Sequence, residues 1–212
     1  MSETKFSIQE ALKYGWETFK AKAGFFIALT VVLGLITAVP DYIIGKLFEQ
    51  GSVMRFVSEL VLRLIGLFLG MITTRISLDL YDTGETDLSK ISDLIPQFLP
   101  YLGGKILYGL IVLVGLVLLI VPGIIVSYMF LYVGYLIIDR QLGPIEALKE
   151  SKVVTDGSKM NLFLFSLVIA LINIVGVVCL LVGLLVTIPV TLMASVYVYR
   201  QLSPRAEVVA AA

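Results

Sequence analysis

Two long stretches without a charged side chain dominate the hydrophobic pattern of the chain. Ile106 to Ile138 covers thirty-three residues and Met160 to Tyr199 covers forty, and neither contains Asp, Glu, Lys or Arg. One helix needs about 20 apolar residues to cross the roughly 30 Å hydrocarbon layer of a bilayer. Each stretch is therefore too long for a single crossing, and each predicts a helical hairpin within a membrane.

The whole pattern predicts an all-α integral membrane fold with six transmembrane helices arranged as three hairpins. Proline and glycine mark the turns, because proline cannot continue the hydrogen bonding of a helix and glycine tolerates tight turns. We expect one turn at Val121-Pro122-Gly123 and another between Gly176 and Gly183. The predicted spans are residues 24–46, 54–80, 102–121, 123–140, 159–178 and 181–202.

A segment with one apolar face precedes each predicted hairpin. These segments are residues 7–20, residues 87–98 and the stretch that begins at Gly143-Pro144. In the first of them the apolar face consists of Ile8, Leu12, Trp16 and Phe19, and charged residues recur on the opposite face. Such amphipathic helices suit the headgroup layer of a membrane, and packing on the protein's own spans explains the pattern as well. Both alternatives stay open.

A unit made of a surface helix and a hairpin recurs along the chain. The tetrapeptide Glu-Ala-Leu-Lys begins at Glu10 and again at Glu146, before corresponding spans. We therefore interpret residues 1–212 as a single polytopic membrane domain with internal repeats. Its predicted repeat units are 5–82, 87–141 and 143–203.

The distribution of Lys and Arg predicts which ends of the spans face the cytoplasm. Cytoplasmic loops of membrane proteins carry an excess of these residues. One predicted side holds Lys5, Lys13, Lys20, Lys22, Arg75, Lys90, Lys105, Arg140, Lys149, Lys152, Lys159, Arg200 and Arg205, and the other holds Lys46, Arg55 and Arg63. We therefore expect a multi-pass protein whose termini and amphipathic helices are all cytoplasmic.

Composition excludes several classes of site. The formal net charge is zero, so no basic field points to nucleic acid. The chain contains no His and a single cysteine, Cys179, which excludes histidine-based zinc sites, histidine bases and thiolate clusters. No phosphate-binding loop, dinucleotide fingerprint or nucleophile elbow occurs. We therefore expect no enzyme, with no catalytic residues, no cofactor and no metal.

An acidic cluster at the inner end of the second predicted span leaves one alternative. Its members are Asp79, Asp82, Glu85, Asp87 and Asp93. Carboxylates in such a group could coordinate Mg²⁺ or Ca²⁺. A solvated turn, with Asp87 capping the next helix, explains the same residues.

Charged side chains interrupt the second predicted span. Arg55, Glu59 and Arg63 are four residues apart and therefore share one helix face. Ionisable groups within a membrane are functional candidates by default. Our hypothesis is an inward-facing pair of Glu59 and Arg63, and a pair that neutralises itself at the outer interface is the alternative. Asn173, deep in the fifth span, completes the candidate intramembrane polar site, although a helix–helix hydrogen bond is its default role.

The surface helices supply candidate contacts to lipid headgroups, namely Lys13, Trp16, Lys20, Lys149 and Lys152. We expect a non-enzymatic membrane domain that binds lipid, anionic headgroups in particular, or a protein partner. That partner is a second copy of the chain or another membrane protein. The competing hypothesis is a small-molecule or ion transporter or channel in which Glu59 and Arg63 line a polar cavity.

Several short motifs resemble those of a known family. They are Leu80-Tyr81-Asp82-x-Gly84-Glu85, Val121-Pro122-Gly123-Ile124, Asp139, Gly143-x-x-x-Ala147-Leu148-x-x-Ser151 and Gly157. Together they resemble the YciC-like uncharacterised prokaryotic inner-membrane proteins, and they are similar to the membrane domain attached to some glycerophosphoryl diester phosphodiesterases. The resemblance implies a six-helix domain in the plasma (inner) membrane of a prokaryote, with no established activity. Members often carry a basic residue before the serine, where this chain has Glu150.

Overall fold

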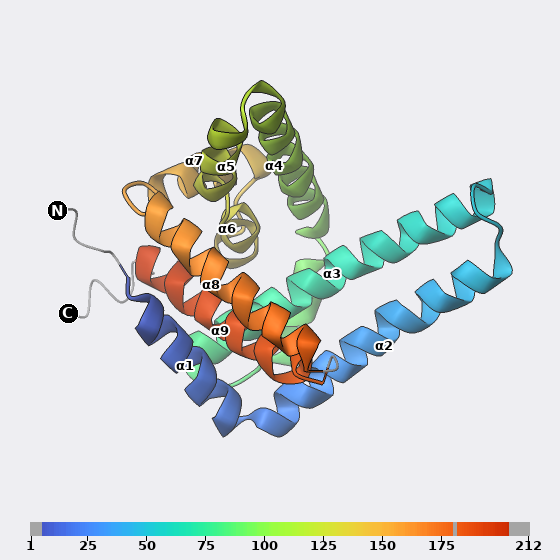
Figure 1. Ribbon diagram of the computed structural model, residues 1–212, viewed down its shortest axis with the longest axis horizontal. Helices are drawn as coiled ribbons and strands as arrows, with labels where there is room; N and C mark the ends of the chain where they lie inside the picture. Colours follow the sequence, from blue (N-terminus) through green and yellow to red (C-terminus); the bar gives the residue numbers. More distant parts are fainter. Residues whose placement is uncertain (1–5, 180–181, 204–212) are drawn as a thin grey trace.

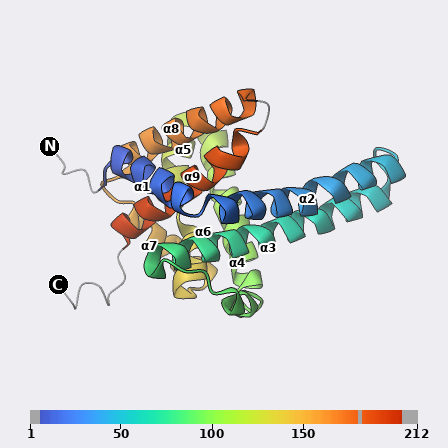
Figure 2. The ribbon, with the colours of Figure 1, turned by 90° about the horizontal axis from the view of Figure 1, so that it is seen from below.

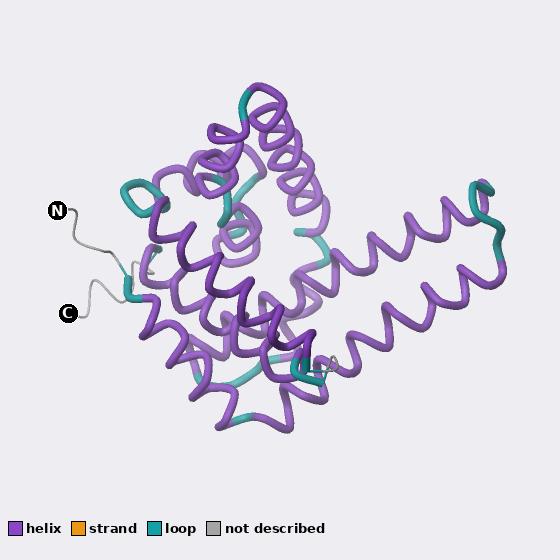
Figure 3. The backbone as a smooth tube through the Cα atoms, viewed as in Figure 1, coloured by secondary structure: helices purple, strands orange, loops and turns teal. Residues whose placement is uncertain are grey.

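The computed structural model describes residues 6–179 and 182–203, and within these ranges the chain forms helices and turns but no strand (Figure 3). Lys5, Leu181 and Arg205, which the predictions above use, lie outside the described residues. The elements in chain order are α1 (Ile8–Ala21), α2 (Ala23–Leu47), α3 (Val53–Thr83), a 3₁₀ helix (Leu88–Leu94), α4 (Phe98–Leu118), α5 (Ile120–Met129), α6 (Val133–Arg140), α7 (Pro144–Val154), α8 (Lys159–Val178) and α9 (Leu184–Leu202).

Six helical segments of the described chain are long and apolar enough to cross a membrane. They are Ala23–Leu47, Val53–Thr83, Phe98–Val117, Gly123–Arg140, Lys159–Val178 and Leu184–Leu202. The prediction of an all-helical fold with six candidate spans is therefore confirmed. The division of the chain into three repeat units stays a prediction.

Helix α6 lies within the body of the molecule, where it packs against α3, α4 and α7 (Figure 1). The hairpin of α2 and α3 projects well beyond the rest of the molecule in both views (Figures 1 and 2). The closed ends of the three hairpins point in different directions (Figure 1). The placement of all three turns on the outer side of a membrane therefore stays a prediction from the distribution of Lys and Arg.

Helices α6 and α9 supply much of the buried protein core. Leu136, Ile137 and Ile138 on α6 are fully buried, as are Met193 and Val196 on α9. By contrast, most apolar side chains of α2 and of the outer half of α3 are exposed. Apolar side chains that no protein surface covers are suited to contact with lipid.

Helix α1 packs closely along α9. The buried face consists of Ala11, Gly15 and Phe19, while Trp16 is 46% exposed. A Cβ atom at Gly15 would collide with the carbonyl oxygen of Val190, so the absence of a side chain there lets the two backbones approach. Ser7 caps the start of α1, since its Oγ accepts a hydrogen bond from Glu10 N at 3.3 Å.

The prediction of an amphipathic α-helix as the second surface helix is wrong. Instead of one α-helix over residues 87–98, the chain forms a short 3₁₀ helix, Leu88–Leu94, and a turn before α4. Asp87 Oδ1 accepts hydrogen bonds from Ser89 N at 3.0 Å and Ser89 Oγ at 2.6 Å, which fixes a tight turn. Pro96 has no N–H to donate, so a continuous helix into α4 is disfavoured.

The turn between the third and fourth spans comes earlier than predicted. It lies at Leu119, whose backbone is extended, and Pro122 already belongs to the first turn of α5. A proline is tolerated there because the first N–H groups of a helix have no intrahelical acceptor. Gly123 serves a close approach instead, since a Cβ on Gly115 would lie 3.0 Å from its Cα.

The fourth span is also interrupted, between Met129 and Val133. Its helical bonding breaks there, and Ser151 on α7 and Thr155, which follows α7, satisfy the released backbone groups. Ser151 Oγ accepts a hydrogen bond from Tyr132 N at 3.3 Å and donates to Met129 O at 3.0 Å. Thr155 Oγ1 donates to the same carbonyl at 3.1 Å. Serine and threonine side chains permit such breaks in membrane helices, so the Ser151 of the family-like motif has a structural role here.

Candidate functional site

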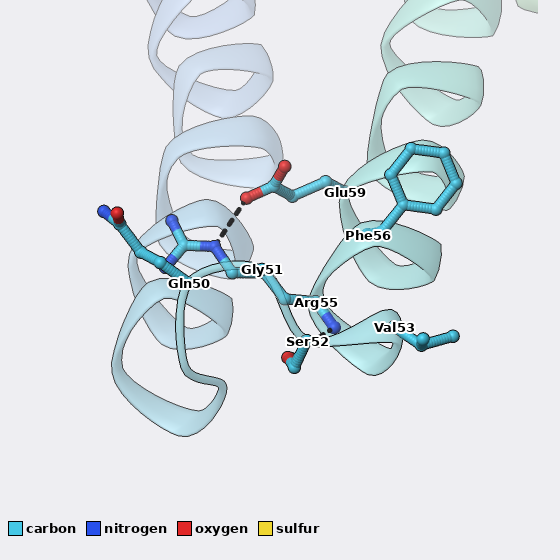
Figure 4. A pocket seen from close by; sticks show the side chains of 7 residues that line it. All are labelled: Gln50, Gly51, Ser52, Val53, Arg55, Phe56 and Glu59. Carbon is cyan, nitrogen blue, oxygen red and sulfur yellow. Dashed lines mark hydrogen bonds and ion pairs between the residues drawn. The ribbon is translucent and has the colours of Figure 1, made fainter.

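Arg55, Glu59 and Arg63 lie in the half of α3 that follows the α2–α3 turn. Helix α3 begins at Val53 because Ser52 caps it: Ser52 Oγ accepts a hydrogen bond from Arg55 N at 3.3 Å. Arg55 and Glu59 point toward one another in Figure 4, where Arg55 Nε donates to Glu59 Oε1 at 2.8 Å. They line an open cavity of about 500 Å³ together with residues 50–53 and Phe56.

The predicted pairing of Glu59 with Arg63 is wrong, because Glu59 pairs with Arg55 instead. Both arginines are four residues from Glu59 along the helix. Arg55 is favoured because Nη1 also donates to Phe48 O at 3.5 Å, at the end of α2. Arg63 is exposed and makes no ion pair within the described part of the chain.

Glu59 and Arg63 nevertheless line one polar cavity of about 400 Å³. Asp41 on α2 faces this second cavity, together with Thr37, Ala38 and Leu62. Opposite charges on facing helices line this cavity, namely the Asp41 carboxylate on α2 and the Arg63 guanidinium on α3. The cavity therefore suits the binding of ionic groups.

Asn173 does not join this group. It lies on α8, where its Nδ2 donates to Ile169 O at 3.1 Å and to Thr191 Oγ1 on α9 at 3.3 Å. Its default role as a hydrogen bond between neighbouring helices is therefore confirmed.

Sequence reasoning missed the most deeply buried charges of the described chain. Arg200 on α9 and Asp139 on α6 have side chains that are 5% and 0% exposed. Arg200 Nη1 and Nη2 donate to the two carboxylate oxygens of Asp139 at 2.5 Å and 2.8 Å. Nη2 also donates to Asp82 Oδ2 on α3 at 2.7 Å, and Tyr199 OH donates to Asp139 Oδ2 at 2.8 Å. This cluster joins three helices that are distant in the sequence.

The amino-acid sequence contains a pattern that indicates this cluster. Asp139 directly follows one long uncharged run and Arg200 directly follows the other. An acid and a base at the ends of two apolar spans are candidates for pairing, because a buried unpaired charge is costly. Neighbouring Arg75 similarly donates from Nε to Asp79 Oδ2 at 3.1 Å.

The acidic cluster around the C-terminal end of α3 has cations beside three of its carboxylates. Asp79 pairs with Arg75 and Lys90, Asp82 pairs with Arg200, and Asp87 pairs with Lys90. No group of three or more His, Cys, Asp or Glu side chains in the described residues is arranged to hold a metal ion. Hydrogen bonds from Ser89 lower the pKa of Asp87 below its ordinary value, in keeping with its capping role.

All five candidate headgroup contacts are exposed: Lys13, Trp16 and Lys20 on α1, and Lys149 and Lys152 on α7. Lys20 Nζ lies 5.7 Å from the centroid of the Trp16 ring, within cation–π range. On α7 the acidic residues are engaged by the protein itself. Glu150 pairs with Arg140 at 2.9 Å, and Glu146 accepts a hydrogen bond from Gly143 N at 3.2 Å. Lys149 and Lys152 make no ion pair within the described residues.

Comparison with known proteins finds distant relatives of unassigned activity. The chain is similar to the uncharacterised protein Rv2560 of Mycobacterium tuberculosis, with 27% identity over 231 aligned residues that cover 96% of this chain and 70% of the relative. The uncharacterised proteins Mb2590 of Mycobacterium bovis and MT2637 of M. tuberculosis match with the same identity and coverage. No protein-family profile matches the chain, and no solved structure matches it.

Proposed function

We propose that the protein is a non-enzymatic membrane domain that binds anionic lipid headgroups through α1 and α7. The observation that carries this proposal is the pair of exposed lysines on α7, Lys149 and Lys152, which lack acidic partners in the described residues while neighbouring Glu146 and Glu150 are engaged. Exposed Ile145 and Val153 lie on the same helix. Basic and apolar groups side by side suit the boundary between headgroups and acyl chains.

Helix α1 supports the same proposal. Trp16, the single tryptophan of the chain, is exposed, and Lys20 lies beside its ring. Tryptophan favours the membrane interface because its ring is apolar and its N–H can donate a hydrogen bond. In this role α1 packs on the rest of the protein through Ala11, Gly15 and Phe19. Its exposed residues Lys13, Trp16 and Lys20 contact the lipid.

Membership of the YciC-like family, or kinship with the phosphodiesterase-associated membrane domain, is part of this proposal. So is residence in a bacterial plasma membrane with cytoplasmic termini. Bacterial relatives of unassigned activity and six candidate spans support both. A second copy of the chain or another membrane protein is the alternative occupant of the surface helices.

One observation favours the competing proposal of a transporter or channel. Asp41, Glu59 and Arg63 line a common cavity within the predicted membrane-spanning hairpin, as a polar path would require. Asn173 lies in a different helix pair, bonded to Thr191. Since the predicted lining residues are divided between two places, we prefer the lipid-binding proposal.

Neutralising the two α7 lysines tests the proposal. In native mass spectrometry of the detergent-solubilised protein, Lys149→Gln combined with Lys152→Gln should weaken the retention of phosphatidylglycerol about 30-fold. A basic residue near a membrane surface contributes about 1 kcal/mol to its attraction for anionic lipid, so two contribute about 2 kcal/mol. Lys46→Gln, at the other predicted side, is the matched control and should bind as the unmodified protein does. Equal retention by all three proteins would refute the proposal.

A further inference from the structure

Three cavities of the α2–α3 hairpin share lining residues and lie one after another along it. Glu59 lines both the cavity at the turn and the charged cavity beside it. Thr37 lines both the charged cavity and a third cavity of about 540 Å³ that leads toward the body of the protein. This third cavity ends against Tyr101 on α4 and Pro189 on α9. We call this succession of cavities, from the tip of the hairpin to α4 and α9, the groove.

The outer end of the groove carries two opposite charges that are not paired with each other. Arg55 engages Glu59. Asp41 and Arg63 are exposed, line the same cavity, and make no ion pair within the described part of the chain. A ligand that carries both a negative and a positive group can satisfy each of them.

The position of Arg63 within the predicted membrane span explains why a charged ligand would be favourable there. Only eleven uncharged residues separate Arg63 from Arg75 on α3. At about 1.5 Å per residue the two charges are about 18 Å apart along the helix, which is less than the roughly 30 Å of hydrocarbon in a bilayer. Arg75 is paired with Asp79, whereas Arg63 has no ion pair within the described residues, and an anionic group of a ligand would offset its charge.

The inner part of the groove is open and apolar. Gly34, Gly66 and Gly70 line it, and a Cβ atom at any of the three would meet nothing within 4 Å. Four threonines also line it, but each hydroxyl already donates to a backbone carbonyl of its own helix. These bonds are Thr30 to Phe26 O, Thr37 to Leu33 O, Thr73 to Leu69 O and Thr74 to Gly70 O, at 2.8–3.0 Å. The groove therefore suits a hydrocarbon chain better than a polar solute.

We propose that this groove binds one zwitterionic phospholipid of the phosphatidylethanolamine type. The phosphate lies against the Arg63 guanidinium, the ammonium group lies against the Asp41 carboxylate, and one acyl chain follows Gly34, Gly66 and Gly70 toward the core. Charge at one end and an apolar channel at the other match the two parts of a phospholipid. A helix from a second copy would fill the apolar channel but would bring no defined anion to Arg63. The site is separate from the lysines of α1 and α7.

Filling the groove tests this proposal without disturbing the packing of the protein. Gly70→Leu places a side chain in open space within the groove, whereas Gly109→Leu on α4 places one in open space elsewhere. The purified full chain is titrated with dioleoyl phosphatidylethanolamine or dioleoyl phosphatidylglycerol and the bound lipid is counted by native mass spectrometry. We expect one tightly held phosphatidylethanolamine, at least tenfold weaker binding in the Gly70→Leu variant, and unchanged binding in the Gly109→Leu variant.

Variants of the charged residues distinguish lipid in this groove from lipid on the surface helices and from a second copy of the chain. Arg63→Gln and Asp41→Asn should each weaken phosphatidylethanolamine binding at least tenfold, while Lys149→Gln combined with Lys152→Gln should leave it unchanged. Equal binding by the Gly70→Leu variant and the unmodified chain would overturn the proposal. In the variant that lacks both α7 lysines, affinity for phosphatidylglycerol equal to that for phosphatidylethanolamine, and insensitive to Asp41→Asn, would also overturn it. Dimers that dissociate in the Gly70→Leu variant, without any lipid adduct, would assign the groove to a second copy instead.

Discussion

Replacing Asp139 with leucine should destabilise the protein by about 3–5 kcal/mol, the cost of leaving one partner of a buried ion pair behind. Arg200 would lose both oxygens of its bidentate acceptor, and Tyr199 OH would lose its acceptor as well. Since Asp139 lies on α6 and Arg200 on α9, the loss would fall where the core elements meet. The free energy of unfolding, measured by SDS titration in mixed micelles, reports the effect.

A second variant distinguishes pairing from simple loss of packing. Asp139→Leu combined with Arg200→Met replaces the buried pair with apolar groups, and such replacements are often close to neutral. We expect the double variant to be less destabilised than the sum of the two single variants by more than about 1 kcal/mol. Glu17→Leu, at an exposed pair with Lys13, should change stability by no more than about 0.5 kcal/mol. Additive effects at Asp139 and Arg200 would refute the pairing.

Replacing Gly15 with leucine should separate α1 from α9. A Cβ atom there would overlap the carbonyl oxygen of Val190 and approach Ala194 N to 3.2 Å, and these backbone atoms cannot move aside as a side chain can. We expect a loss of about 2–3 kcal/mol in the free energy of unfolding, at the upper end for overpacked sites. Crosslinking between cysteines placed at Glu10 and Tyr197, whose side chains are hydrogen-bonded at 3.3 Å, should also fall.

The matched control for this variant is Gly24→Leu, because a Cβ atom at Gly24 meets nothing within 4 Å. Crosslinking is measured for both glycine variants in a Cys179→Ser background, since Cys179 is the single natural cysteine. If the Gly15→Leu and Gly24→Leu variants crosslink equally well, the close packing of α1 on α9 is refuted.

The apolar pattern was sufficient to predict the number and place of the candidate spans. The bounds predicted for the fifth span, residues 159–178, are those of α8. Long uncharged runs have few alternatives to a membrane helix. The break after Met129 could not be predicted in this way, because no proline or glycine lies between Met129 and Val133 and the stabilising hydroxyls come from Ser151 and Thr155, which are distant in the sequence.

The candidate sites were predicted less completely because pairing partners are chosen by tertiary structure. Glu59 has an arginine four residues away on each side, and only the position of the α2–α3 turn decides in favour of Arg55. Arg200 pairs with Asp139 and Asp82, which are far from it in the chain. The exposed positions of Lys149 and Lys152, in contrast, followed from the periodicity of their own helix.

Thiol labelling of intact cells tests the central claim, that the surface helices lie on the cytoplasmic side of a multi-pass membrane protein. In a Cys179→Ser background, single cysteines at Gln50 in the α2–α3 turn and at Lys149 on α7 are exposed to a membrane-impermeant maleimide. We predict labelling of the Gln50→Cys variant in intact cells, and labelling of the Lys149→Cys variant only after the cells are lysed. Labelling of Lys149→Cys in intact cells, with Gln50→Cys protected, would contradict the account.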